Sequence, residues 1–420
     1  MPPTDVRHAP VPAAPTSRPP APGSPASGSP ARIRLAAWPV TAVFVLSNAA
    51  TPLYVVWRRE LGFSSGTSTV IFAAYIVGLL GALTVAGALS DRIGRKPVLL
   101  PALGLAALAC LLFATAASVP ALVVARLLTG IAVGATVSAG MAAVADVAGA
   151  AHRRLGALAA SSAMVLGAGL GPMLAGVLSE TAPGPTTTVF AVEAVLLATA
   201  FVVVYRLPLA RPAAAPTTAA RWFRVPSVPA ANRGQLLLGI AVFAPGITAT
   251  SFVLSLGPAL LADLLDTSSR IVAGSTAFVM FAAATGVQFA VRRWAVRTVL
   301  LAGAATIAAG MIVLLAAVYL ASAPLLITAA ILAGAGQGLG QLGGLTLLGA
   351  HVPRERAAEA NAALSVGGYL PAGLLPVAVG YLGDAVGLRT GTTVFALVLI
   401  GAATVAAALV LMNRPAGERG

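Results

Sequence analysis

Apolar runs of about 20 residues recur along the whole chain, and they limit the possible folds more than any other feature. A run of this length crosses the ~30 Å hydrocarbon core of a bilayer as a single helix. Charged residues make up only 9% of the 420 positions, whereas soluble domains carry about a quarter. The runs are too long and too uniformly apolar to be strands of a membrane barrel. We therefore predict an all-α membrane protein with twelve transmembrane helices, at 35–57, 67–89, 98–117, 120–144, 156–178, 187–206, 235–261, 271–290, 298–320, 324–349, 361–382 and 391–412.

The net charge of +14 would suit a nucleic-acid partner, but its distribution favours a lipid bilayer. If the N-terminus is cytoplasmic, 21 of the 26 Lys and Arg residues fall on the cytoplasmic side and four on the other side. This asymmetry follows the positive-inside rule. It predicts a multi-pass protein of the plasma (inner) membrane with both termini in the cytoplasm. The basic face would contact anionic lipid heads, and no nucleic-acid partner is expected.

Two polar stretches divide the chain. Residues 1–34 are rich in Pro, Ala, Ser and Gly and are expected to form a disordered cytoplasmic tail. Residues 207–234 carry five prolines and separate the runs six and six, as a cytoplasmic linker. The predicted bundles are therefore 35–206 and 235–412, followed by a short cytoplasmic tail at 413–420. The remaining connections are too short to hold a soluble domain.

The two halves resemble each other at three widely spaced places. Pro52 matches Pro258, ARLLTGIAVG matches AAILAGAGQG, and KPVLL matches RTVLL, at offsets of 206, 204 and 201 residues. A repeated six-span unit in the same orientation predicts two six-helix bundles with pseudo-twofold symmetry about an axis along the membrane normal. A substrate site would then lie between the bundles near the midplane.

The connection after the second run reads G-A-L-S-D-R-I-G-R-K, from Gly87 to Lys96. With twelve spans divided six and six, this motif resembles the signature of the major facilitator superfamily at Gly87, Asp91, Arg92, Gly94, Arg95 and Lys96. The resemblance implies an inner gate latch that clasps the start of span 11, near Glu359 and Asn361, when the inner side is closed. The alternative is that these charges only set the topology. The equivalent segment, VRRWAVRTVL, has Arg292 in place of Asp91, so a second latch is not expected.

Two ionisable residues are predicted deep inside spans of the first half. Arg126 and Glu193 each lie about six residues into a run, or roughly 9 Å. A mid-span arginine costs ~2.5–3.5 kcal/mol on insertion scales, so it should face a cavity or a partner. With Gly130 and Gly134, Arg126 resembles the family's span-4 pattern, which implies a role in proton coupling. We hypothesise that Arg126 and Glu193 interact directly or through water. The alternative for Glu193 is a buried neutral carboxyl without a coupling role.

The fifth run carries a glycine–proline string, G-A-G-L-G-P-M-L-A-G. Gly167, Gly171, Pro172 and Gly176 resemble the signature of the drug/proton antiporters, an exporter group of the superfamily. Ala175 stands where a further glycine is expected. The alternative is general close packing of helices, for which small residues at this spacing are common.

Further polar residues are candidates for inner-face ion pairs and for a substrate cavity. The expected ion-pair residues are Asp146, Arg153, Arg154, Glu355, Arg356 and Glu359. The cavity candidates are Asn48, Thr51, Tyr54, Thr136, Thr248, Ser251, Gln288, Gln337 and Gln341. Many of these will instead hydrogen-bond to neighbouring helices. They include no cluster of charges, and a weakly polar cavity suits amphipathic molecules better than sugars or phosphates.

Together these features predict a secondary active transporter, not an enzyme, that works by alternating access. The expected activity is proton-coupled efflux of small amphipathic or drug-like molecules, by a monomer with protons as the coupling ion and no cofactor. The alternative on the same fold is a proton-coupled importer or exporter of sugars or organic acids. No G-x-x-x-x-G-K-S/T phosphate loop is present in the sequence, which argues against ATP as the energy source. A membrane enzyme would need paired acids, or a nucleophile and its base, at the same depth in the membrane. The sequence shows neither arrangement.

Overall fold

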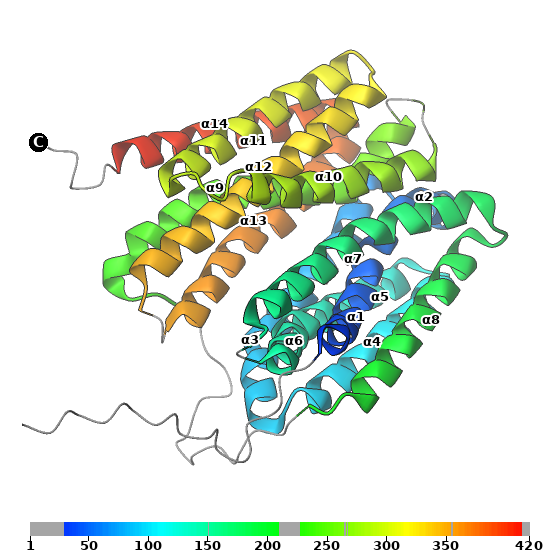
Figure 1. The fold of residues 1–420 in the computed structure, drawn as a ribbon. Helices are drawn as coiled ribbons and strands as arrows, with labels where there is room; N and C mark the ends of the chain where they lie inside the picture. Colours follow the sequence, from blue (N-terminus) through cyan, green and yellow to red (C-terminus); the bar gives the residue numbers. More distant parts are fainter. Residues whose placement is uncertain are drawn as a thin grey trace, which may run out of the picture.

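The computed structural model describes residues 29–149, 151–209, 227–263, 266, 268–353 and 356–413. Within these ranges the regular structure is helical, and twelve helical spans are long and apolar enough to cross a membrane, as predicted. Figure 1 shows them arranged as two bundles. The first six spans form one bundle and the last six form the other. We call the face at which the first span begins and the last one ends the terminal face, and the other side the opposite face.

In the described residues, the first bundle contains eight α-helices, one short 3₁₀ helix and one short π-helical segment. Its spans are α1 (Pro30–Ala49) with η1 (Thr51–Leu53) and α2 (Tyr54–Leu61); α3 (Ser65–Ile93); α4 (Lys96–Ala114); α5 (Val119–Ala135) with η2 (Thr136–Gly140) and α6 (Met141–Ala148); α7 (Arg153–Thr181); and α8 (Pro185–Arg206). The second bundle contains η3 (Ala230–Asn232) and α9 (Arg233–Asp263), α10 (Arg270–Ala290), α11 (Val296–Tyr319), α12 (Ala323–His351), α13 (Ala357–Val386) and α14 (Leu388–Met412).

Two spans of the first bundle are interrupted at places where the sequence carries polar groups. In the first span, Pro52 lies in the 3₁₀ turn that separates α1 from α2, because proline cannot donate the backbone hydrogen bond that would continue the helix. In the fourth span, η2 is a short π-helical segment that begins at Thr136. Such segments inside α-helices occur frequently at functional sites.

The predicted boundaries differ from the observed ones mainly at the ends of spans. Helix α1 begins at Pro30 after the cap Ser29, so residues 30–34 belong to the first helix rather than to a tail. The remaining parts of the tails and of the linker, residues 1–28, 210–226 and 414–420, lie outside the described residues. Many of the observed helices extend beyond the predicted apolar runs, because polar residues can continue a helix past the hydrocarbon core.

Each bundle has a core of its own, and the bundles meet mainly along two pairs of helices. In the first bundle Trp57, Phe113 and Phe190 form one stacked aromatic cluster. In the second bundle Phe252 stacks on Phe395, with ring centroids 4.1 Å apart. Between the bundles, α3 packs against α13 and α7 packs against α10 (Figure 1). These pairs are equivalent under the predicted pseudo-twofold relation, since α3 and α10 are the second span of each half and α7 and α13 are the fifth.

Candidate transport site

Arg126 lies inside the first bundle on α5, and its side chain is 0% exposed. Its Nε donates to the hydroxyl of Tyr54 at 2.7 Å, and its Nη1 donates to the carbonyl oxygen of Ser47 at 2.7 Å. The guanidinium carbon lies 5.3 Å from the Tyr54 ring centroid and 5.6 Å from that of Phe72, distances at which cation–π attraction contributes. Its Nη2 has no hydrogen-bond partner. The break in the first span supplies two of these contacts.

Glu193 is also buried, with 2% of its surface exposed, and it lies on α8. One of its carboxylate oxygens, Oε2, has no hydrogen-bond partner. Phe190, one turn earlier on the same helix, stacks on Phe113 with ring centroids 4.8 Å apart. The guanidinium carbon of Arg126 lies 5.9 Å from the centroid of the Phe113 ring. Arg126 therefore borders this aromatic cluster, and Glu193 lies one helical turn from Phe190, a member of it.

The structure places both residues in the interior, and it does not join them directly. Among the described residues, no ion pair within 4.0 Å connects Arg126 to Glu193. Each carries one unpartnered polar atom. An unpartnered polar group in an apolar interior costs free energy, so both groups are available to a new partner when the conformation changes. The proposed coupling between them stays a prediction.

The remaining cavity candidates are dispersed over both bundles. Asn48, Thr51 and Tyr54 lie together at the break of the first span and are buried. Thr136 lies in the π-helical segment, and its hydroxyl has no partner. In the second bundle Thr248 and Ser251 are buried on α9, while Gln288, Gln337 and Gln341 are half-buried on α10 and α12. Of these candidates, Tyr54 lies next to Arg126 and accepts its hydrogen bond.

An aromatic layer between the bundles is a feature that the sequence analysis missed. Phe72 and Tyr75 on α3 form a tilted pair at 6.3 Å, and Phe243 on α9 meets Tyr369 on α13 edge to face at 6.5 Å. Phe72 and Phe243 are buried in one apolar cluster against which Tyr75 and Tyr369 pack. The layer therefore contains residues of both halves and lies beside Arg126 through Phe72. Isolated aromatic residues in apolar runs give no sequence signal for such a layer.

The motif at Gly87–Lys96 lies at the terminal face, and its first part is helical rather than a loop. Helix α3 continues to Ile93, and Gly94 ends it with a φ of +99°, which favours glycine. Gly87 lies on α3 with open space around it. Arg95 bonds Asp91 at 2.6 Å, Asp146 at 3.0 Å and the hydroxyl of Ser90 at 2.6 Å. Burial lowers the pKa of Arg95, but its bonds to Asp91 and Asp146 raise that pKa by more.

The contacts of Arg95 and Lys96 stay within the first bundle. Lys96 donates to the carbonyl oxygen of Tyr205 at 2.8 Å, at the end of α8, where a cation is favourable. Asp91 and Asp146 are exposed by 71% and 55% of their side chains, so each ion pair contributes little, ~0–1 kcal/mol. The described contacts of Asp91, Arg95 and Lys96 therefore lie within the first half.

Of the residues predicted to form ion pairs at the inner face, some are paired, some are exposed and one lies outside the described residues. Asp146 pairs with Arg95, whereas Arg153 and Arg154 are exposed at the start of α7. Arg356 pairs with Glu359 at 2.7 Å and also donates to the Ser227 hydroxyl of the linker at 3.0 Å. Glu355 lies outside the described residues. Arg92 is half-buried on the last turn of α3.

The glycine–proline string on α7 has two separate packing roles. A methyl group at Gly167 would lie 2.6 Å from the Thr41 carbonyl oxygen, and one at Gly171 would overlap the Val45 carbonyl oxygen, so these glycines let α7 approach α1. A methyl group at Gly176 would overlap the Arg270 carbonyl oxygen of α10. A methyl group at Gly274 of α10 would overlap the carbonyl oxygen of Pro172. The second part of the string therefore belongs to the contact between the bundles.

Comparison with known proteins agrees with this architecture. The model of the Major Facilitator Superfamily matches residues 37–297, more than half of the chain. The 3-(3-hydroxy-phenyl)propionate transporter of Escherichia coli (strain K12) is 40% identical over 108 residues, a match that spans about a quarter, 26%, of either protein.

Solved structures of transporters share the fold over nearly the whole chain. A bacterial homolog of the human lysosomal transporter Spinster, in an inward-facing and unoccupied conformation, has a TM-score of 0.71 at 14% identity, over 92% of this chain and 98% of its own. The nucleoside transporter NupG (D323A mutant) has a TM-score of 0.70 at 14% identity, over 91% of this chain and 100% of its own. The D-xylose–proton symporter has a TM-score of 0.67 at 16% identity, over 90% and 96%. With twelve spans, two bundles and this match in sequence, the chain belongs to the major facilitator superfamily of secondary transporters.

Proposed function

We propose that this transporter exports small amphipathic molecules in exchange for protons, by alternating access between its two bundles. The observation that carries the proposal is the pair Arg126 and Glu193. Both are ionisable side chains buried inside the first bundle, and each has a polar atom without a partner. Ionisable residues at membrane depth are costly and mark ion or substrate pathways. A carboxyl that can take up and release a proton there would supply the coupling.

Two further features support amphipathic cargo and efflux. The aromatic layer of Phe72, Tyr75, Phe243 and Tyr369 offers apolar surface from both halves, beside a buried cation. Aromatic and apolar walls with a few polar groups are typical of sites for small organic molecules. The string from Gly167 to Gly176 resembles that of the drug/proton antiporters, which favours the outward direction of transport.

A second candidate function is proton-coupled transport of organic acids. The partial relative from Escherichia coli is a transporter of 3-(3-hydroxy-phenyl)propionate, an aromatic acid. Arg126 is a buried cation surrounded by aromatic rings, and its free Nη2 could donate to a carboxylate. Sugars are less favoured, because the aromatic layer carries few hydrogen-bonding groups.

Purified protein in liposomes separates these functions. We would measure counterflow of two labelled panels, lipophilic amines and aromatic carboxylates, with the pH set independently on each side and protein-free liposomes as the control. We expect saturable amine exchange, and accumulation driven by a pH gradient that a protonophore abolishes. Exchange of carboxylates alone would select the second candidate. Saturable flux that ignores the pH gradient would exclude proton coupling altogether.

A further inference from the structure

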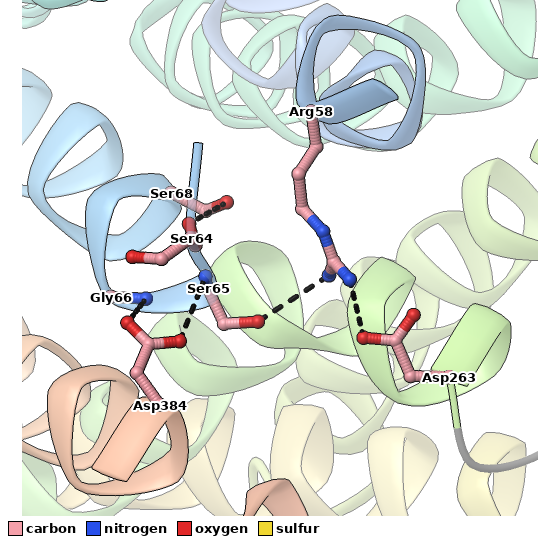
Figure 2. A network of polar contacts seen from close by, with 7 residues as sticks. All are labelled: Arg58, Ser64, Ser65, Gly66, Ser68, Asp263 and Asp384. Atoms are coloured by element: carbon pink, nitrogen blue, oxygen red, sulfur yellow. Dashed lines mark hydrogen bonds and ion pairs between the residues drawn. The ribbon is translucent and has the colours of Figure 1, made fainter. Parts of the chain in front are cut away.

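Three sets of polar contacts join the two bundles at the opposite face. Asp384 of α13 accepts hydrogen bonds from the backbone N–H groups of Ser65, at 3.1 Å, and Gly66, at 2.9 Å. These are the first two residues of α3. A carboxylate at this position satisfies N–H groups that lack a partner within the helix, and it interacts favourably with the helix dipole. Figure 2 shows Asp384 directed at this helix start.

Glu180 of α7 makes the equivalent contact with the second bundle. Its Oε1 accepts from the backbone N–H groups of Arg270 and Ile271, the first two residues of α10, and from the hydroxyl of Ser269. Glu180 and Asp384 are 204 positions apart, and Ser65 and Arg270 are 205 apart, which matches the offset of the internal repeat. The same contact therefore occurs twice, once in each direction across the pseudo-twofold axis.

The third contact is an ion pair between the ends of the first and seventh spans. Arg58 bonds Asp263 at 2.6 Å, and it also donates to the Ser65 hydroxyl at 3.3 Å. Ser65 thus joins the ion pair to the Asp384 contact in one network (Figure 2). Arg58 and Asp263 are 205 positions apart, so the repeat places opposite charges at equivalent ends.

Glycines allow the helices to approach closely enough for these contacts. A methyl group at Gly66 would lie 2.7 Å from the Asp384 carboxylate, and one at Gly380 would lie 2.9 Å from the Cα of Gly66. The equivalent of Gly380 in the first half is Gly176, which faces Arg270 in the same way. Both carboxylates therefore lie beside a glycine that brings their helix against the partner bundle.

We propose that Glu180 and Asp384, with the Arg58–Asp263 pair, form the gate that closes the transport pathway at the opposite face. The two carboxylates belong to different bundles, and each holds the first turn of a helix of the other bundle. Rotation of the bundles away from each other at this face breaks both contacts together, because they are related by symmetry. The gate rests on alternating access, which is part of the proposed function, but it does not depend on the cargo or on the coupling ion.

Distances between pairs of spin labels, measured by double electron–electron resonance on the protein without substrate, test this gate. In a Cys110→Ala background, spin labels at Ala117 and Thr390 report the opposite face, and labels at Ala151 and Ala350 report the terminal face; all four positions are exposed. The gate variant is Glu180→Gln with Asp384→Asn. Exposed carboxylates at helix starts shift an equilibrium by ~2–5-fold each, so we expect the conformation open at the opposite face to gain roughly tenfold in population.

The matched control is Glu60→Gln with Asp266→Asn, which removes two exposed carboxylates from the same face without touching the gate. It should leave both distances unchanged. Exchange of the ion pair, as Arg58→Asp with Asp263→Arg, should restore the distances that Arg58→Asp alone disturbs. Unchanged distances in the gate variant, or an equal shift in the control, would overturn the gate. Counterflow of the wild-type protein is read separately: a failure to exchange amines, together with the expected distance shifts in the gate variant, would count against the proposed function and not against the gate.

Discussion

At the scale of single residues, the buried arginine and glutamate are held in different ways. Tyr54 and the Ser47 carbonyl satisfy two nitrogens of Arg126, and aromatic faces surround its carbon. Glu193 has no charged partner among the described residues. An ionised carboxylate in such a place is costly unless it is paired. Under the proposed function, Glu193 is therefore the group that we expect to change its charge during a transport cycle.

A substitution at Glu193 separates proton coupling from substrate exchange. Glu193→Gln keeps the shape and the buried position but cannot exchange a proton. Coupling between sites is typically 5–150-fold, so we expect accumulation driven by a pH gradient to fall roughly tenfold or more. Counterflow at equal pH should stay within about twofold, because exchange without a gradient needs no net proton movement.

The control for this substitution is Glu60→Gln, the same exchange at an exposed position near the end of α2. It should leave accumulation dependent on the pH gradient. Full gradient-driven accumulation by Glu193→Gln would assign the buried carboxyl to a structural role and would leave Arg126 without a titrating partner in the first bundle.

At the scale of helices, the glycine–proline string shows what a sequence pattern can and cannot predict. The spacing of Gly167, Gly171 and Gly176 predicts close packing, and each glycine does lie against a neighbouring helix. The spacing does not predict that Gly167 and Gly171 contact α1 in the same bundle, whereas Gly176 contacts α10 in the other bundle. A contact partner depends on tertiary packing, which a short periodic pattern does not contain.

An alanine at Gly171 should weaken the packing of α7 on α1. The added methyl group would overlap a backbone carbonyl oxygen, which cannot move as a side chain can. Overpacking of this kind typically costs ~1–3 kcal/mol. We expect Gly171→Ala to unfold at a lower temperature in detergent. The matched control is Gly104→Ala on α4, where nothing lies within 4 Å of the new methyl group, and it should unfold at or above the wild-type temperature, since alanine favours helix. Equal unfolding temperatures in the two variants would contradict this contact.

The architecture of the whole molecule was the feature most predictable from sequence, and the proposed gate was the least predictable. Twelve spans and the six-plus-six division follow from hydrophobic length, which the bilayer fixes independently of tertiary contacts. Arg126 and Glu193 stand out because charge is rare in such spans. Glu180, Asp384, Arg58 and Asp263 lie at span ends, where charges are common, so only the repeat offset distinguishes them. The aromatic layer gave no sequence signal, because Phe and Tyr are ordinary residues in apolar helices.

The two faces of the molecule are unequal, and this has a testable consequence. At the opposite face, each half contributes a carboxylate that binds the other half. At the terminal face, the first half has the carboxylate of Asp91, whereas the second half has Arg292 at the equivalent position. Without substrate, the molecule should therefore rest closed at the opposite face, with Asp91 and Asp146 paired to Arg95 of the same bundle, as they are in this structure.

The latch role expected for Asp91 can be tested at the terminal face. If Asp91 stabilises closure of the terminal face by binding near the start of α13, Asp91→Asn should disfavour that closed state by ~2–5-fold, as for an exposed carboxylate at a helix start. Because the cycle must pass through this state, turnover in counterflow should slow by a similar factor. Arg292→Asn, at the equivalent exposed position of the second bundle, should leave turnover unchanged. An equal slowing in both variants would mean that these charges only set the topology, and normal turnover in Asp91→Asn would mean that closure of the terminal face depends on other contacts.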